Sequence, residues 1–129
     1  MERANEIKND LERAEKALES AERNFKEKDF FTAANRLFVA CESAIYALLK
    51  VEYGSISISR ERILIRLKEV DAHLKEMYDK SYDLRVQADY EKNSKLLPLT
   101  EENILVLLKD VVSMVQKIKE DILKKASNK

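Results

Sequence analysis

The sequence is poor in the residues that form turns, bind metals or make cross-links. Its 129 residues include one glycine, one proline, one cysteine, one histidine and no tryptophan. A β-sandwich or β-barrel needs many Gly- and Pro-rich turns, so their scarcity argues against both. The single Cys41 has no intrachain disulfide partner, and with the single His73 it cannot complete a Cys/His zinc site within one chain. The composition therefore predicts helices, no metal site and no cofactor.

An excess of charge of either sign and a long apolar run are missing as well. Lys plus Arg and Asp plus Glu each number 24. Proteins that bind nucleic acid by neutralising phosphates usually carry a basic excess, which this chain lacks overall. No apolar run approaches the ~20 residues that span a bilayer, and residues 1–6 lack the apolar core of a signal peptide. We therefore expect a cytoplasmic protein that does not bind membranes.

What the sequence does have is apolar residues at steps of three and four. This spacing places them on one face of a helix and predicts a first helix from Ile7 to Phe25. In the second segment Asp29 is a predicted N-cap, and Gly54 is the predicted stop. Two apolar stripes, one starting at Phe30 and one at Phe31, predict that this second helix is the central one.

Three further segments complete the chain. Residues 55–59 alternate Ser and Ile but are flanked by helices, so we interpret them as a connecting loop with Ile anchors. Residues 60–91 carry one helical register, as a single helix or as two with a break near Asp71. Residues 93–99, which contain Pro98, are a predicted loop. Thr100 is then the predicted N-cap of a last helix that runs through Ile122, with a frayed tail from about residue 124.

These segments predict an all-α fold, an up-down helical bundle of four to five helices that forms a single domain over residues 1–129. The three/four spacing is typical of helices that cross at shallow angles. A two-stranded coiled coil is the rival architecture, but it needs only one seam, whereas the second helix has two stripes.

Two groups of polar residues stand out against this pattern. Tyr78, Tyr82, Arg85 and Asp89 follow one another at steps of four, three and four, which places them on one helical stripe. An arginine between aromatic rings and a carboxylate can hold a phosphate or stack on a base. A plain surface Arg–Asp pair beside half-buried tyrosines is the alternative.

The second group is Asn35 and Arg36, which interrupt the apolar second helix. They mark an exposed or interface edge of that helix, or Arg36 takes part in ligand binding. Cys41 lies on a core stripe and is expected to be inert. His73 precedes the apolar Leu74 and is expected at the surface.

Both polar groups lie in segments that resemble a known family. Residues 28–40, Lys-Asp-Phe-Phe-Thr-Ala-Ala-Asn-Arg-Leu-Phe-Val-Ala, are similar to the opening of HEPN (higher eukaryotes and prokaryotes nucleotide-binding) domains. Residues 84–90, Leu-Arg-Val-Gln-Ala-Asp-Tyr, resemble the Arg-x-x-Ala-Asp-Tyr element of a small prokaryotic HEPN branch. The resemblance covers nearly the whole chain, because the order of the helices matches too.

The resemblance implies a helical bundle, often a homodimer, that is paired with a minimal nucleotidyltransferase in toxin–antitoxin-like systems. Active HEPN members are metal-independent ribonucleases with an Arg-x(4–6)-His motif. Arg85 matches the family arginine, but no histidine follows it anywhere in this chain. The motif histidine would stand five to seven residues after Arg85, where this chain has Tyr90, Glu91 and Lys92, with Asp89 one position earlier. An aspartate is largely ionised at neutral pH and a tyrosine largely protonated, so neither replaces histidine well.

The sequence therefore favours a binding and interaction module over an enzyme. The expected ligand is a nucleotide or RNA, held by Arg85, Asp89 and Tyr90 with help from Tyr82, Tyr78 and Arg36. A divergent ribonuclease that uses Arg85 with Asp89 or Tyr90 as catalytic residues is the first alternative. A purely structural bundle is the second.

Overall fold

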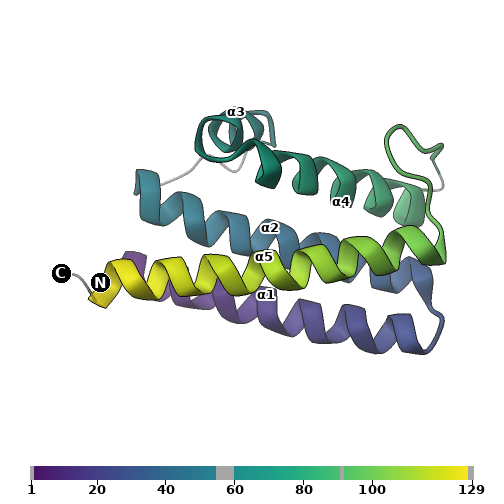
Figure 1. Ribbon diagram of the computed structural model, residues 1–129, viewed down its shortest axis with the longest axis horizontal. Coiled ribbons are helices and arrows are strands. Elements are labelled where there is room, and N and C mark those ends of the chain that lie inside the picture. Colours follow the sequence, from purple (N-terminus) through teal and green to yellow (C-terminus); the bar gives the residue numbers. More distant parts are fainter. Residues whose placement is uncertain (1, 55–59, 91, 128–129) are drawn as a thin grey trace.

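A computed structural model describes residues 2–54, 60–90 and 92–127. Over these residues the chain forms five helices and no strand: α1 (Glu2–Lys26), α2 (Phe30–Tyr53), α3 (Arg60–Val70), α4 (Ala72–Tyr90) and α5 (Glu101–Ser127). The predicted all-α bundle is confirmed. Helices α1, α2, α4 and α5 lie along the long axis and alternate in direction, so α1 begins and α5 ends at the same end of the bundle (Figure 1).

The shorter α3 is the exception to this arrangement. It is seen end-on in Figure 1, so it runs across the long axis of the bundle. Residues 60–90 are thus two helices, with the break at Asp71, one of the two possibilities that the register allowed. The Asp71 N–H donates to the Leu67 carbonyl at 2.8 Å and closes α3. Its carboxylate accepts the His73 N–H at 2.8 Å, which makes Asp71 the N-cap of α4.

The predicted helix caps are also present. The Asp29 carboxylate accepts the Thr32 N–H at 3.1 Å at the start of α2, and the Thr100 hydroxyl accepts the Asn103 N–H at 3.1 Å at the start of α5. Gly54 ends α2 with φ of 84° and ψ of −59°, a conformation that only glycine adopts readily. The predicted loop at residues 55–59 lies outside the described residues.

Helix α2 is the central helix, as its two stripes predicted. Helices α1, α4 and α5 all pack against it. Its buried residues are Ala33, Ala34, Leu37, Phe38, Ala40, Cys41, Ser43, Ala44, Ile45, Ala47, Leu48 and Leu49. Phe31 was expected in the core but is 58% exposed. It lies one turn before Asn35, on the open face of α2, where both residues line a surface hollow.

The end of α5 differs from the expectation of a frayed tail. The helix continues to Ser127, and Lys125 in its last turns forms an ion pair with Glu52 on α2. Within the described residues, no helix is long and apolar enough to cross a membrane.

Helix α4 leads into the loop of residues 92–99 through a buried carboxylate. Asp83 is 7% exposed. It accepts the backbone N–H groups of Lys95, Leu96 and Leu97 at 3.0 to 3.1 Å, and the Ser94 hydroxyl at 3.4 Å. Burial by itself would raise the pKa of Asp83, but these hydrogen bonds outweigh burial and hold the pKa below 3.8. The side chain thus fixes where the chain turns towards α5.

One turn later, Gln87 holds the same loop. Its amide nitrogen donates to the Leu97 carbonyl at 2.7 Å, and its amide oxygen accepts the Leu99 N–H at 2.9 Å. Asp83 and Gln87 lie at i and i+4, on one face of α4. Together they anchor the loop to the C-terminal turns of α4.

Candidate functional site

The predicted stripe of polar residues on α4 contains an ion pair near the end of the helix. The Arg85 Nε lies 3.2 Å from the Asp89 Oδ2. Both side chains are partly buried, at 32% and 27% exposure. An ion pair with this much exposure contributes little to stability, because water screens it. The pair is relevant to function because Asp89 also contacts α2.

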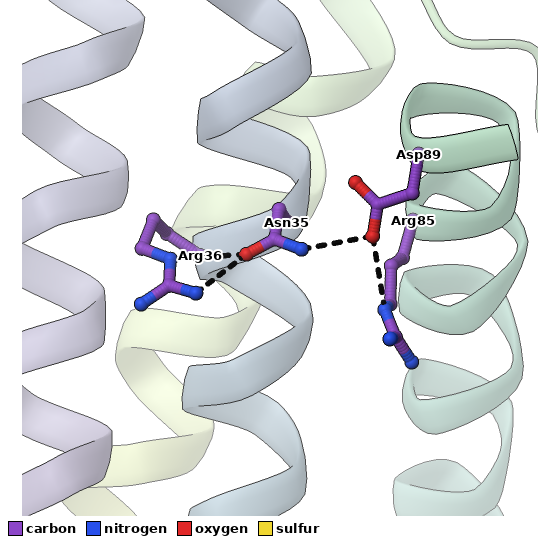
Figure 2. Close-up of polar contacts among 4 residues, drawn as sticks. All are labelled: Asn35, Arg36, Arg85 and Asp89. Atoms are coloured by element: carbon purple, nitrogen blue, oxygen red, sulfur yellow. Dashed lines mark hydrogen bonds and ion pairs between the residues drawn. The ribbon is translucent and has the colours of Figure 1, made fainter.

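The same carboxylate reaches across to α2, where the two polar groups of the sequence meet. The Asn35 amide nitrogen donates to the Asp89 Oδ2 at 2.9 Å. The Asn35 amide oxygen in turn accepts the Arg36 Nε and Nη2 at 3.0 and 2.6 Å. Figure 2 shows this four-residue network of Arg36, Asn35, Asp89 and Arg85, with α5 behind α2. The network therefore lies on the face of the bundle away from α5.

An aromatic cluster lies beneath Arg85. The guanidinium carbon of Arg85 is 5.2 Å from the ring centre of Phe38, a cation–π distance. Phe38 is buried, and its ring meets those of Tyr78 and Tyr82 edge-on at 5.4 and 5.7 Å. Among the described residues, the two Nη atoms of Arg85 donate no hydrogen bond. The side chain is thus held through Nε and through its face, while its outer edge can still donate to an anion.

The three tyrosines that the sequence assigned to ligand binding have different positions. Tyr78 is 1% exposed, so the expectation that it binds ligand is wrong: it is a core residue, because its ring fills the space between α2 and α4. Tyr82 is half-buried against Phe38. Tyr90 is 60% exposed, and in the described part of the chain no hydrogen bond or ring contact joins it to the network.

The network borders a shallow, open hollow of about 370 Å³. Its lining residues are Phe31, Thr32, Asn35, Arg36 and Asp89. Pockets for small molecules have similar volumes but enclose most of the ligand. An open surface of this kind suits a larger molecule that lies across it.

Glu42, which no sequence motif singled out, is half-buried on α2 one turn after Phe38. Burial raises the pKa of Glu42, while a hydrogen bond from the Tyr46 hydroxyl and the positive charges of Arg85 and Arg13 act in the opposite direction. Its position seven residues after Asn35 places it on the same open face of α2. This seven-residue spacing from Asn35 was the sequence feature that could have identified Glu42. The site therefore has two arginines, Arg36 and Arg85, and two carboxylates, Asp89 and Glu42, so any anion must be recognised by hydrogen bonds rather than by net charge.

Cys41 and His73 lie outside this site. His73 is exposed in the first turn of α4, as expected. Cys41 is buried on α2. Among the described residues, no group of His, Cys, Asp and Glu side chains is arranged to hold a metal ion.

We expect the Cys41 thiol to be unreactive in the folded protein. Burial raises its pKa to about 12, so almost no thiolate is present at neutral pH. With Ellman's reagent at pH 8, the native protein should release no chromophore over minutes, and one thiol equivalent should appear after denaturant is added. Fast reaction of the native protein would show that α2 opens readily.

No protein-family model matches this sequence, and no characterised protein matches it. The resemblance to HEPN domains therefore rests on the two motifs and the order of the helices.

Proposed function

We propose that this chain is a HEPN-type binding and interaction module. In this proposal Arg85, Asp89 and Tyr90 bind a nucleotide or RNA without cleaving it, and the module is the partner of a minimal nucleotidyltransferase in a toxin–antitoxin-like pair. The observation that supports it most is the state of Arg85. Its Nε is held by Asp89 and its face by Phe38, so its Nη atoms can donate hydrogen bonds to a phosphate with little further loss of side-chain entropy.

A homodimer is part of the proposal. The uncovered face of α2 carries Arg36 and Glu42 together with the exposed Phe31. A two-fold interface pairs a surface with itself, so a face with both signs of charge and an apolar anchor is suited to it. In such a dimer Arg85 would lie beside a groove shared by the two subunits.

The divergent ribonuclease is kept as a second candidate because of Glu42. Cleavage of RNA needs a group that moves protons near neutral pH. The sequence offered only Asp89 and Tyr90 for this role. Glu42, whose pKa is raised by burial and which senses the charge of Arg85, is better suited to act as an acid.

The proposal predicts that Arg85→Ala weakens RNA binding by about tenfold or more, because a charged hydrogen bond to phosphate contributes ~1.5–3 kcal/mol. The measurement is fluorescence anisotropy of a labelled 12-nucleotide single-stranded RNA in EDTA, with the same RNA run on a denaturing gel. The matched control is Arg62→Ala, which removes the same charge from the exposed surface of α3. Light scattering gives the oligomeric state, with twice the 15.0 kDa chain mass expected.

Each outcome points to one function. Binding without cleavage that is lost in Arg85→Ala and kept in Arg62→Ala supports the module. Cleavage in EDTA that depends on Arg85 and on Glu42 would replace it with the ribonuclease. If Arg85→Ala and Arg62→Ala bind the RNA with equal affinity, Arg85 does not form the binding site. In that case, or if the wild type binds no RNA, only the structural bundle remains.

A further inference from the structure

A second hollow lies on the opposite side of α2 from the four-residue network. It has a volume of about 410 Å³ and runs between α5 and the junction of α3 and α4. Its floor is apolar: Val70 on α3 borders it, and the core residues Leu48, Leu74, Met114 and Ile118 reach it with only 3–8% of their surface exposed. We call it the α5 groove.

The groove exists because the chain breaks at Asp71. Helix α3 turns across the bundle there instead of continuing along α5 (Figure 1). On the facing side, α5 contributes the small, exposed Ser113 to the lining, where a large side chain would occupy part of the groove. The groove is therefore a result of helix geometry and of residue size.

The α5 wall of the groove is long. Asp110, Ser113, Lys117 and Asp121 follow at steps of three and four, so they lie on one line along the helix. Val106, four residues before Asp110, continues this line and is 61% exposed. The part of this line that borders the hollow, from Asp110 to Asp121, spans about 16 Å at the ~1.5 Å rise of an α-helix, which is about three turns.

The rim of the groove is acidic. Carboxylates at Asp71, Asp110 and Asp121 line it, together with Glu52, which Lys125 already neutralises. Asp110 and Asp121 have no ion-pair partner among the described residues. Among the residues that the structure describes, Lys117 is the one lysine or arginine that lines the hollow. An apolar floor between unpaired carboxylates is complementary to an apolar stripe flanked by basic residues.

We propose that the α5 groove docks a basic amphipathic helix of a partner protein. Its apolar stripe would cover Leu74, Met114 and Ile118, and its Lys or Arg side chains would pair with Asp110 and Asp121. Helix-in-groove recognition uses anchors at this three/four spacing over several turns, which matches the length of the wall. The proposal does not depend on the Arg85 site, which is on the other side of α2.

The test uses an 18-residue synthetic helix with leucines at three/four spacing and lysines on both flanks, labelled for anisotropy. The full-length protein should bind this peptide, and should not bind versions with Glu for Lys or Ser for Leu. Asp110→Lys combined with Asp121→Lys should weaken binding about tenfold, since two exposed ion pairs are lost and become repulsive. Ser113→Trp, which fills the groove, should weaken binding as well.

The control is Glu19→Lys combined with Glu120→Lys. These substitutions make the same change of charge at exposed positions that do not line the groove. The control variant and Arg85→Ala should bind the basic peptide like the wild type. Equal binding of the acidic or serine peptide, equal loss in the control, or unchanged binding in both groove variants would overturn the proposal. A shift from dimer to monomer in Ser113→Trp would overturn it in favour of a second copy of the chain.

Discussion

Replacing Asp83 with alanine is expected to lower the free energy of unfolding by about 3 kcal/mol, because three backbone N–H groups lose their common acceptor. These N–H groups belong to Lys95, Leu96 and Leu97, and the carboxylate that accepts them is 7% exposed. Urea unfolding followed by circular dichroism measures the change, and the melting temperature should fall by about 10 °C. Asp83→Asn should lose less, since the amide keeps one acceptor oxygen.

The matched control for Asp83 is Glu76→Ala on the same helix. Glu76 forms an exposed ion pair with Lys80 one turn away, so its loss should change stability little. An Asp83→Ala protein as stable as the control would mean that the loop at residues 92–99 holds itself without the carboxylate.

The Asp83 contribution also has a defined dependence on pH. The pKa of Asp83 is lowered in the folded protein, so its stabilising effect is fully present above the unfolded pKa of about 3.9. It is lost as pH falls through the lowered folded pKa. The difference in urea midpoint between wild type and Asp83→Asn should therefore be large at pH 7 and shrink below about pH 4. A constant difference across this range would contradict the assignment.

Replacing Tyr78 with alanine is expected to lower the free energy of unfolding by about 3–5 kcal/mol, the usual effect of removing a large buried aromatic side chain. Tyr78 is 1% exposed and packs against Phe38, the residue on which Arg85 rests. A cavity here would loosen the contact between α2 and α4 and so disturb the network indirectly. Thermal unfolding and RNA affinity are the two measurements.

Tyr78→Phe separates the core role of Tyr78 from the ligand role that the sequence suggested. It keeps the ring and removes the hydroxyl, which should cost only ~1 kcal/mol. RNA affinity should then equal that of the wild type. If Tyr78→Phe kept its stability but lost RNA affinity, the hydroxyl would have to reach the ligand, and its assignment to the core would be wrong.

The limits of the helices were largely predictable, because they depend on residues close together in the chain. Asp29, Gly54 and Thr100 act within a few residues of themselves, and the apolar spacing of α2 reports its burial directly. The break at Asp71 was harder to predict, because the apolar register continues through it. Only the capping of both neighbouring helices by Asp71 separates α3 from α4.

The candidate site was predictable only in its parts. The stripe on α4 correctly placed Arg85 beside Asp89, since residues at i and i+4 are neighbours on any helix. Which side of that stripe is buried depends on how closely α4 packs on α2. This packing buries Tyr78 in the core, whereas Arg85 and Asp89 stay partly exposed. Glu42 escaped notice because its sequence surroundings are those of any charged residue on a helix.

The sequence by itself determined the helical class of this protein, the central position of α2 and most of the helix ends, because local hydrogen bonds and apolar spacing are sufficient for these. Only the tertiary structure brought Asn35 within 2.9 Å of Asp89, a residue 54 positions away, and set the Asp83 carboxylate against three N–H groups of the next loop. Such contacts depend on the relative rotation and spacing of whole helices, which many side chains set together.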